Sequence, residues 1–413
     1  MKLSEELTAR GFVYQTSDEN LEKILDDTKR TVYLGIDPTA TSIHVGNLVP
    51  YMLLNHLMQA GHRVILLMGG GTGLIGDPGG KSEERPFSDP QTIQDQAEAM
   101  EQGIRRFVAE DVEFVNNYDW LQKLSMIEFL RDVGKHFTVN SMIKKDIVAN
   151  RLTDDNSISY TEFSYSLLQA YDYYHLHNEY QCDLQIGGSD QWSNIIAGVD
   201  YIRRRTGDEV FALTLPLVTD KATGKKFGKS EGNAIWLNPE LTTPYQFYQF
   251  WLNTSDENVI DYLKIFTFVS LDEITKLAEL VSTEPAARTA QKRLATEVTT
   301  FVHGAAAEAA EKVSSILFGG GEVSELNEAE REMLLANAPC TTVQNDEALV
   351  DVLVGSGLAS SKREARTFIT DGAVAINGEK VTDPEAVLAP EVFTENIALL
   401  QRGKKQLSIL VRA

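Results

Sequence analysis

Tyr33-Leu-Gly-Ile-Asp-Pro-Thr-Ala-Thr-Ser-Ile-His-Val-Gly-Asn-Leu48 joins a predicted strand to a predicted helix. Residues 32–36 are apolar and form the strand. Asp37-Pro38 ends it, because proline has no N–H to give a sheet and fixes its own φ. A polar turn over residues 39–42 leads to His44-Val-Gly46, where the pattern predicts that a helix begins. The N-terminus of a helix presents free N–H groups and partial positive charge, so this turn suits a phosphate.

The residues that follow complete a βαβ unit. Apolar residues keep helical spacing from Leu48 to Leu57, and Ala60-Gly61 ends the helix. Residues 64–68 form a second strand, whose continuous apolar sequence predicts burial on both faces. Further strands are predicted at residues 112–115, 183–186 and 213–218. The pattern predicts an α/β fold, a Rossmann-like domain on a parallel sheet, with ligands bound beyond the carboxyl ends of the strands.

The composition is that of an acidic globular protein. Of the 413 residues, 43% are hydrophobic and 24% are charged, and the formal net charge of −22 opposes general nucleic-acid affinity. Residues 351–413 carry equal numbers of acidic and basic residues, so the excess negative charge lies in residues 1–350. No apolar run approaches the roughly 18 residues of a membrane span, and the N-terminus lacks a signal peptide's apolar segment. We expect a cytoplasmic protein without a membrane segment.

The two cysteines and the glycine-rich loop over residues 69–82 match no complete motif. Cys182 and Cys340 have neither disulfide nor metal-site spacing. Gly71-Thr-Gly-Leu-Ile-Gly76 satisfies G-x-G-x-x-G, but a dinucleotide fingerprint requires the glycines to open a helix, and Asp-Pro-Gly-Gly follows them here. A P-loop fails by one residue, since Ile75 stands where its first glycine belongs. An NAD-dependent dehydrogenase therefore has little support, while a flexible loop or a different nucleotide site stays open.

One face of the predicted helix 160–174 carries polar side chains. Tyr165, Gln169 and Asp172 stand at i, i+4 and i+7, so they lie on the same side of the helix. Buried polar groups require partners, which favours a binding surface for a small polar molecule. The structural alternative is an aromatic-rich helix whose polar tips reach solvent. After the next predicted strand, Asp190 stands where an acid either accepts ribose hydroxyls or caps a helix.

Changes of pattern divide the chain into four segments. They are an α/β domain (residues 1–237), an α-helical domain (238–320), a polar linker (321–347) and a small α+β domain (348–413). The first ends in a glycine-spaced loop with four lysines within residues 221–229, which is either solvated or binds an anion. In the last, one predicted helix carries Lys362, Arg363 and Arg366 near one face, and Asn377-Gly378 after a short strand predicts a β-hairpin.

Three segments together resemble a known family. His44-Val-Gly-Asn47 resembles the HIGH signature, Lys226-Phe-Gly-Lys-Ser230 resembles the KMSKS loop, and residues 351–413 resemble an S4-type RNA-binding domain. Over essentially its whole length the chain is similar to the bacterial tyrosyl-tRNA synthetases, among the class I aminoacyl-tRNA synthetases. The resemblance implies a Rossmann-like catalytic domain, a helical anticodon-side domain and an S4-like domain. It also implies formation of tyrosyl-adenylate and pyrophosphate from L-tyrosine and ATP with Mg²⁺, transfer of tyrosine to the 3′ end of tRNA(Tyr), and a homodimer.

The resemblance further implies roles for individual residues, and nothing in the sequence indicates a metal site in the protein. Residues implied in catalysis, at the phosphates and the leaving pyrophosphate, are Thr39, His44, Lys81, Arg85, Lys226, Lys229 and Ser230. Residues implied in ATP binding are Gly35, Asp37, His44, Gly46, Asn47, Asp190 and Lys229. Residues implied in tyrosine binding are Tyr33, Asp77, Asn117, Tyr165, Gln169, Asp172 and Gln191, with Tyr33 and Asp172 at the phenol hydroxyl. Residues implied in tRNA binding are Lys362, Arg363 and Arg366.

The signatures are matched with two departures. Asn47 replaces the final His of HIGH, and Phe227-Gly228 replace the Met and first Ser of KMSKS. Two further hypotheses stand beside the tyrosine enzyme. A tryptophanyl-type synthetase would share both signatures, but Tyr33 and Asp172 favour a phenol over an indole. An RNA-binding protein that kept the scaffold without activity would not require His44 and the loop lysines.

Overall fold

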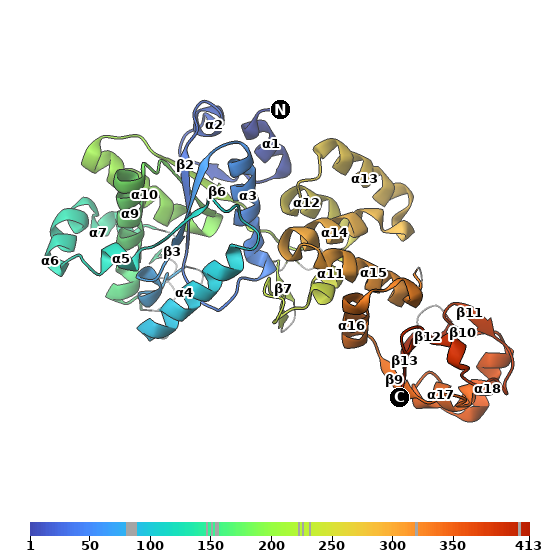
Figure 1. Cartoon of the computed structure of the whole chain (residues 1–413). Coiled ribbons are helices and arrows are strands. Elements are labelled where there is room, and N and C mark those ends of the chain that lie inside the picture. Colours follow the sequence, from blue (N-terminus) through green and yellow to red (C-terminus); the bar gives the residue numbers. More distant parts are fainter. Residues whose placement is uncertain are drawn as a thin grey trace. The chain divides into compact units, whose positions relative to one another are not determined.

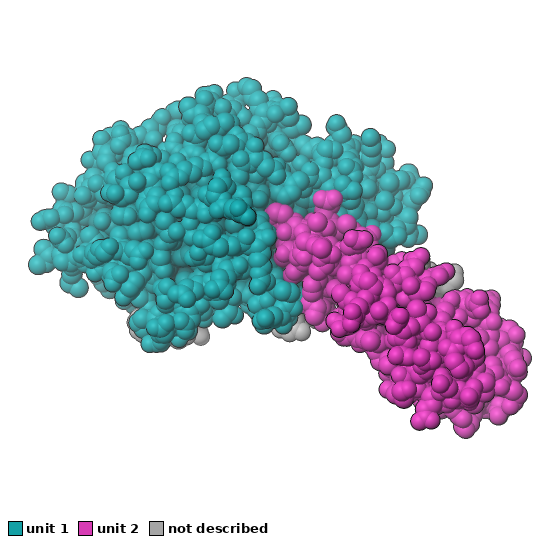
Figure 2. Space-filling view, viewed as in Figure 1, with its two compact units in different colours: residues 1–242, 254–294 teal, residues 243–253, 295–413 magenta. Residues whose placement is uncertain are grey.

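The computed structural model describes residues 1–79, 89–145, 148–149, 152, 157–221, 224, 227–230, 233–318, 321–403 and 406–413, without the side chains of residues 229, 230 and 233. The chain forms two compact units, coloured separately in Figure 2. The first comprises residues 1–242 and 254–294, and the second comprises residues 243–253 and 295–413. The predicted boundary after residue 237 therefore falls inside the first unit.

The first unit is built on a six-stranded sheet, which confirms the predicted α/β class. Its strands are β1 (Gln15–Thr16), β2 (Thr31–Ile36), β3 (Arg63–Met68), β4 (Glu113–Asn116), β5 (Leu184–Gly188) and β6 (Phe211–Leu215). Their order is β1-β6-β5-β2-β3-β4, and every pair is parallel except β1 with β6. The strands predicted from apolar runs are all present, within three residues of their expected bounds.

Helices cover both faces of this sheet. Figure 1 shows α3 (Leu48–Gln59) and α4 (Pro90–Ile104) on one face, and α9 (Tyr160–Tyr180) and α10 (Trp192–Thr206) on the other. Other helices in the described part of the unit are α1 (Leu3–Arg10), α2 (Leu21–Leu25), α5 (Tyr118–Leu121), α6 (Met126–Glu128), α7 (Val139–Ile143), α12 (Asp256–Phe266), α13 (Leu271–Thr283) and the start of α14 (Thr289–His303). A single 3₁₀ turn, η1 (Val45–Asn47), precedes α3, so the α-helix begins just after the predicted His44-Val-Gly46.

The strand order places the functional crevice. Strands β2 and β5 are neighbours at the centre of the sheet. The next strands beyond β2 are β3 and β4, and the next strand beyond β5 is β6. Loops that leave the carboxyl ends of β2 and β5 therefore diverge to opposite faces and open a crevice between them. Tyr33 and Gln185 are directly opposite each other in the parallel register of these two strands. Both side chains therefore project from the same face of the sheet.

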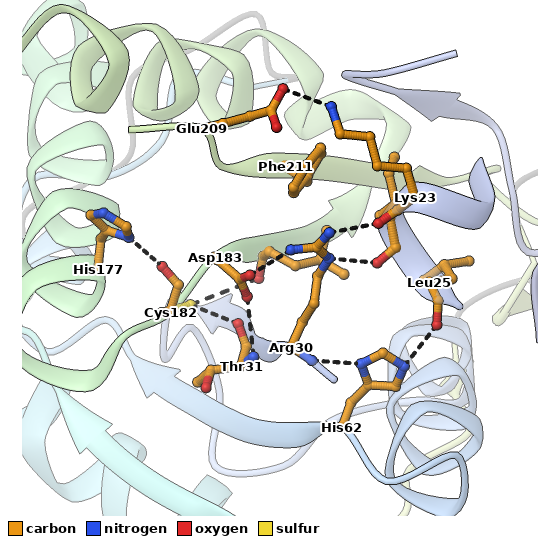
Figure 3. A network of polar contacts seen from close by, with 12 residues as sticks. Lys23, Leu25, Arg30, Thr31, His62, His177, Cys182, Asp183, Glu209 and Phe211 are labelled. Carbon is orange, nitrogen blue, oxygen red and sulfur yellow. Dashed lines mark hydrogen bonds and ion pairs between the residues drawn. The ribbon is translucent and has the colours of Figure 1, made fainter. Parts of the chain in front are cut away.

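At the amino ends of the strands, a polar network joins α2 to the sheet (Figure 3). The Arg30 guanidinium donates from Nη1 to Asp183 Oδ2, from Nε to the Ile24 carbonyl and from Nη2 to the Lys23 carbonyl, each at 2.6 Å. It lies 4.1 Å from the centroid of the Phe211 ring. One nearly buried arginine thus satisfies a carboxylate and two orphan carbonyls of α2.

A histidine extends the same network to the start of β3. His62 Nδ1 accepts the Arg30 backbone N–H at 3.1 Å, so Nε2 carries the ring proton and donates to the Leu25 carbonyl at 3.1 Å. Burial, followed by the charge of Lys29, lowers the pKa of His62. The neutral ring therefore serves both hydrogen bonds at neutral pH.

We expect Arg30→Met to lower the free energy of unfolding by roughly 2–4 kcal/mol, because Asp183 and two carbonyls lose a buried, charge-assisted partner together. Chemical denaturation monitored by circular dichroism measures this value. Arg203→Met is the matched control, since Arg203 is 67% exposed in its pair with Asp200, and an exposed pair contributes about 0–1 kcal/mol. Equal losses in the two variants would contradict the structural role of Arg30.

The second unit combines helices with a five-stranded sheet. Its helices are α11 (Pro244–Leu252), α15 (Ala306–Phe318), α16 (Glu328–Asn337), α17 (Leu349–Gly355) and α18 (Lys362–Thr370), together with the end of α14 (Thr289–His303). Its strands are β9 (Cys340–Val343), β10 (Val374–Ile376), β11 (Glu379–Val381), β12 (Ile397–Arg402) and β13 (Gln406–Arg412), in the order β11-β10-β12-β13-β9. The predicted α+β tail is therefore present.

Two local predictions for this unit have different outcomes. The hairpin at Asn377-Gly378 is confirmed, since both residues have positive φ (48° and 83°) between β10 and β11. Residues 321–347, predicted as a linker, contain ordered structure. Helix α16 has a capping box between Asn327 and Glu330, and β9 pairs with β13 in the sheet. The small domain's sheet therefore includes residues before 348.

No helix in the described part of the chain is both long enough and apolar enough to cross a membrane.

Candidate active site

The carboxyl ends of β2 and β5 open into a cavity of about 580 Å³ in the first unit. Most of the residues predicted for ATP and tyrosine line it. They are Tyr33, Gly35, Asp37, Thr39, His44, Gly46, Asn47, Asp77, Tyr165, Gln169, Asp172, Asp190 and Gln191. Segments separated by more than a hundred residues along the chain therefore contribute to one cavity.

The other predicted site residues either do not line this cavity or are not among the residues that the structure describes. Asn117 is completely buried behind the cavity wall and contacts Asp172. Lys81, Arg85 and Lys226 lie outside the described residues, as do the side chains of Lys229 and Ser230, whose backbone forms β7 (Lys229–Ser230) against β8 (Asn233–Ala234). Lys362, Arg363 and Arg366 are exposed on α18 of the second unit.

Asp172 is the buried anion of the cavity. Its Oδ1 accepts the Trp120 indole N–H at 2.7 Å, and its Oδ2 accepts Asn117 Nδ2 at 2.9 Å. Burial raises the pKa of the Asp172 carboxyl to about 7, and the two donors act against that rise. Because each oxygen already accepts a fixed donor, a ligand at Asp172 meets a carboxylate held as an acceptor. Such a group selects a ligand that brings its own hydroxyl or N–H.

Tyr33 and Gln185 supply unsatisfied polar atoms beside it. The Tyr33 hydroxyl and the Gln185 Oε1 are both buried, and neither has a hydrogen-bond partner among the described residues. Burial, followed by the Asp172 charge, raises the pKa of Tyr33 well above its ordinary range, so its O–H remains a donor. Both residues line the cavity. A buried polar atom without a partner costs free energy, so these atoms favour a ligand with a polar group at this depth.

Carboxylates gather at a second end of the cavity. Asp37 Oδ2 accepts the Tyr165 hydroxyl at 2.9 Å. Asp77 Oδ2 accepts Gln191 Nε2 at 2.6 Å, and its Oδ1 accepts the Gly79 N–H at 3.0 Å. Two carboxylates oriented by neutral donors favour a cationic ligand group such as an ammonium.

The two signature segments meet at the start of α3. His44 Nδ1 accepts the Gly46 N–H at 3.0 Å, so in the neutral ring Nε2 carries the proton. A Cβ added to Gly46 would lie 2.7 Å from the Phe227 carbonyl, and one added to Gly228 would lie 2.7 Å from the Gly46 nitrogen. The HIGH-like and KMSKS-like backbones are therefore in direct contact, which only glycine permits at both positions.

Phe227 anchors the second of these segments. Its buried ring lies 4.8 Å from Tyr262 and 5.2 Å from Phe266, both on α12, and its N–H donates to the Val218 carbonyl at 2.9 Å. The aromatic residue at the KMSKS methionine position thus holds this segment against α12 through apolar packing.

The glycine-rich loop after β3 serves close packing. Residues 72–74 form a short 3₁₀ turn, η2 (Thr72–Leu74), and not the α-helix that a dinucleotide fingerprint requires. A Cβ on Gly69 would lie 2.1 Å from Asp37 Oδ1, and one on Gly70 would lie 2.4 Å from Asn116 Oδ1. The glycines therefore let Asp37 and Asn116 approach the backbone. The dehydrogenase hypothesis loses its structural basis.

Sequence reasoning assigned no specific role to three residues of this site, namely Thr72, Trp120 and Gln185. Thr72 was included only as part of the glycine-rich loop, although it is a hydroxyl residue among glycines. Trp120 ends a segment at the carboxyl end of β4, where a pocket wall is expected. Gln185 is a polar residue inside an otherwise apolar strand, which is an available signal, because a buried amide requires a partner.

Comparisons with known proteins identify the family of the chain. The family "tRNA synthetases class I (W and Y)" matches residues 26–319, and the family "Tyrosine--tRNA ligase SYY-like C-terminal domain" matches residues 330–410. A protein named tyrosine--tRNA ligase from Pediococcus pentosaceus is 50% identical over 98% of both chains. One of the same name from Limosilactobacillus fermentum is 48% identical over 99% of both chains.

Solved structures share the fold of the first part of this chain. A C-terminally truncated mitochondrial tyrosyl-tRNA synthetase from Aspergillus nidulans superposes with a TM-score of 0.70 at 29% identity, covering 77% of this chain and 94% of that one. A tryptophanyl-tRNA synthetase from Encephalitozoon cuniculi has a TM-score of 0.55 at 15% identity, covering 75% and 89%, and shows the shared fold alone. The chain belongs to the tyrosyl-tRNA synthetases, within the class I tRNA synthetase family.

Proposed function

We propose that this chain is a tyrosine–tRNA ligase. In the first step, a carboxylate oxygen of L-tyrosine attacks the α-phosphorus of ATP, and the bond to the β-phosphate breaks to release pyrophosphate. In the second, a terminal ribose hydroxyl of tRNA(Tyr) attacks the carbonyl of the adenylate, and AMP leaves. The observation that carries the proposal is the pair formed by Asp172 and Tyr33, one fixed acceptor and one unsatisfied hydroxyl deep in a single cavity.

The phenol of tyrosine satisfies this pair. Its O–H donates to Asp172, and its oxygen accepts from the Tyr33 hydroxyl. That hydroxyl has no hydrogen-bond partner among the described residues. Phenylalanine offers neither contact, so the buried groups stay unpaired and its binding is weakened. Tryptophan carries its N–H at a different position on a larger ring. Complementarity at the buried end therefore favours tyrosine over both.

At the other end, we propose that Asp77, Tyr165 and Gln169 bind the tyrosine ammonium and Gln191 its carboxylate. Catalysis in this reaction consists chiefly of positioning and stabilisation of charge on the α-phosphate and pyrophosphate. Residues proposed for the phosphates are Thr39, His44, Lys81, Arg85, Lys226, Lys229 and Ser230. Residues proposed for the rest of the nucleotide are Gly35, Asp37, Gly46, Asn47 and Asp190, the last at the ribose.

We propose that ATP enters as its Mg²⁺ complex. Mg²⁺ usually keeps several waters and binds through substrate phosphates, so it adds positive charge at the leaving pyrophosphate. We also propose a cytoplasmic location and a division of labour in which residues 1–237 catalyse, residues 238–320 form the anticodon-side domain, residues 321–347 connect, and residues 348–413 bind RNA.

Amino-acid-dependent ATP–pyrophosphate exchange tests the proposal. Wild-type protein should incorporate pyrophosphate into ATP with tyrosine, and far more slowly with tryptophan or phenylalanine at equal concentration. Exchange supported best by tryptophan would favour the related enzyme. Absence of exchange together with tight tRNA(Tyr) binding would favour an inactive RNA-binding protein.

We expect the double variant Arg363→Glu/Arg366→Glu to lower kcat/KM for charging of tRNA(Tyr) by roughly tenfold or more, because both exposed cations on α18 are proposed to face phosphates. Pyrophosphate exchange should be unchanged, since it needs no tRNA. Lys380→Glu, a substitution at an exposed position on β11 of the same unit, is the control. Equal loss of charging and exchange would refute the division of labour.

We propose a homodimer formed through an apolar surface of the first unit. Exposed apolar side chains gather on α6, the turn after it, α7 and the start of α9, at Met126, Ile127, Leu130, Val139, Ile143 and Tyr160. Met126, Ile127 and Tyr160 are 78%, 77% and 72% exposed. Val133, Met142 and Leu167 from the same elements pack in one core cluster, so the exposed residues surround one small subdomain. Several exposed large apolar side chains on one small subdomain favour an interaction site there.

We expect Ile127→Asp to convert the dimer into a monomer, because a charge buried without a partner strongly disfavours association. Light scattering after gel filtration should give twice 45.9 kDa for wild type and 45.9 kDa for the variant. Leu241→Asp, which replaces a half-exposed leucine outside this surface, should remain dimeric. A wild-type monomer at micromolar concentration would contradict the proposed interface.

A further inference from the structure

A continuous chain of hydrogen bonds connects the two ends of the amino-acid cavity. Thr72 Oγ1 donates to Asp37 Oδ1 at 2.7 Å and accepts from Asn117 Nδ2 at 2.8 Å. Asp37 Oδ2 accepts the Tyr165 hydroxyl at 2.9 Å, and Asn117 Nδ2 also donates to Asp172 Oδ2 at 2.9 Å. The chain therefore runs from Tyr165, at the end proposed for the ammonium, to Asp172, at the end proposed for the phenol.

Backbone donors determine the orientation of the Asn117 amide, and with it the direction of the bonds at Thr72. Asn117 Oδ1 accepts the Gly71 N–H at 2.7 Å and the Thr72 N–H at 3.4 Å, so the amide nitrogen faces Asp172 and the Thr72 hydroxyl. The hydroxyl has one proton. Because Thr72 Oγ1 accepts from Asn117, that proton goes to Asp37.

This junction is tightly enclosed. Thr72 is 3% exposed and Asn117 is 0% exposed. A Cβ added to Gly69 would lie 2.6 Å from Thr72 Oγ1 and 2.1 Å from Asp37 Oδ1, so the adjacent glycine leaves room for the contact between them. In an enclosed site, a donor or acceptor that loses its partner has no solvent to replace it.

We propose that Thr72 is a positioning residue that couples the two ends of the amino-acid site, an inference that rests on the proposed function. Removal of its hydroxyl takes one acceptor from the Asn117 NH₂ group and one donor from Asp37. The two backbone N–H groups still hold Asn117 Oδ1, but its NH₂ group loses one of its two acceptors, so the donor to Asp172 is held less rigidly. Asp37 likewise loses the partner that orients it toward Tyr165. One missing hydroxyl therefore disturbs recognition of both the phenol and the ammonium.

The first test compares Thr72→Val with Thr72→Ser in pyrophosphate exchange. Thr72→Val should lower the ratio of kcat/KM for tyrosine to that for phenylalanine by about tenfold, since two buried groups lose a partner. Thr72→Ser restores the hydroxyl and should recover most of the ratio, and KM for ATP should change little in either. Thr214→Val, another fully buried threonine but outside the cavity, controls for loss of a buried hydroxyl. An unchanged ratio in Thr72→Val would overturn the proposal.

The second test is a double-mutant cycle. Tyr165→Phe and Trp120→Phe each remove one donor, at Asp37 and at Asp172, outside the Thr72 junction. With Thr72 present, the effect of the double variant on kcat/KM for tyrosine should differ about fivefold from the product of the two single effects. In a Thr72→Val background, this difference should be less than about twofold. Deviations equal in the two backgrounds would show that Thr72 does not carry the coupling. Exchange supported by another amino acid would refute the proposed function, and the same cycle run with that amino acid would still test the coupling.

Discussion

Asp172→Asn is expected to lower kcat/KM for tyrosine in pyrophosphate exchange by roughly 10²–10⁴-fold. Both Asp172 oxygens accept buried donors, from Trp120 and from Asn117. An amide has one oxygen, so one of these donors faces an NH₂ group and loses its partner, at about 1–3 kcal/mol. The charge-assisted bond to the substrate phenol disappears as well, at about 1.5–3 kcal/mol. The preference for tyrosine over phenylalanine should therefore also fall in Asp172→Asn.

The pH dependence provides a second readout of the same residue. The pKa of Asp172 is raised to about 7, and only its ionised form is an acceptor at both oxygens and toward the phenol. In wild type, kcat/KM for tyrosine, which reports groups of the free enzyme, should therefore fall as the pH drops through about 7. In Asp172→Asn this step should vanish.

Asp200→Asn is the matched control for this experiment. Asp200 carries the same charge on α10, but it is 40% exposed in a pair with Arg203. It should retain both the rate and the pH step of wild type. If Asp172→Asn keeps wild-type selectivity and pH dependence, then Asp172 does not bind the phenol.

Gly228→Ala is expected to slow adenylate formation by roughly 10²-fold, because a displacement of about 1 Å at a positioned site has that effect. Gly228 has φ of +84°, and an added Cβ would lie 2.7 Å from the nitrogen of Gly46 and 2.9 Å from its Cα. The methyl group must therefore push the KMSKS-like segment away from the HIGH-like one. Single-turnover measurement of pyrophosphate release with saturating tyrosine gives the rate.

Gly224→Ala separates the steric clash from backbone strain. Gly224 lies on the same loop with φ of +67°, but an added Cβ would meet nothing within 4 Å. Gly224→Ala therefore has the same cost of a left-handed backbone conformation as Gly228→Ala, but its methyl group does not clash with another segment. Its rate should stay within about tenfold of wild type, and tyrosine affinity, measured by equilibrium dialysis, should be unchanged in both variants. Equal rates in the two variants would show that the contact with Gly46 is unimportant.

Local pattern was sufficient for most secondary structure. The apolar run that became β2, the periodicity of α3 and the Asn377-Gly378 turn are properties of neighbouring residues, so they were predictable. Strand β1 was not predicted, because Gln15 and Thr16 form a strand only by pairing with β6, far away in the chain. Helix α16 was hidden in an acidic segment, although Asn327 and Glu330 form a capping box and Leu334 is buried.

By itself, the sequence determined the α/β class, the motif order and the shared helical face of Tyr165, Gln169 and Asp172, because these depend on spacing along one chain. Only the tertiary structure decided which atoms face one another. It brought Thr72, Asn117 and Trp120 to the carboxylates of the cavity, and it placed Gly228 against Gly46. Hydrogen bonds and close backbone contacts depend on distances between elements, and spacing along the sequence does not encode these distances.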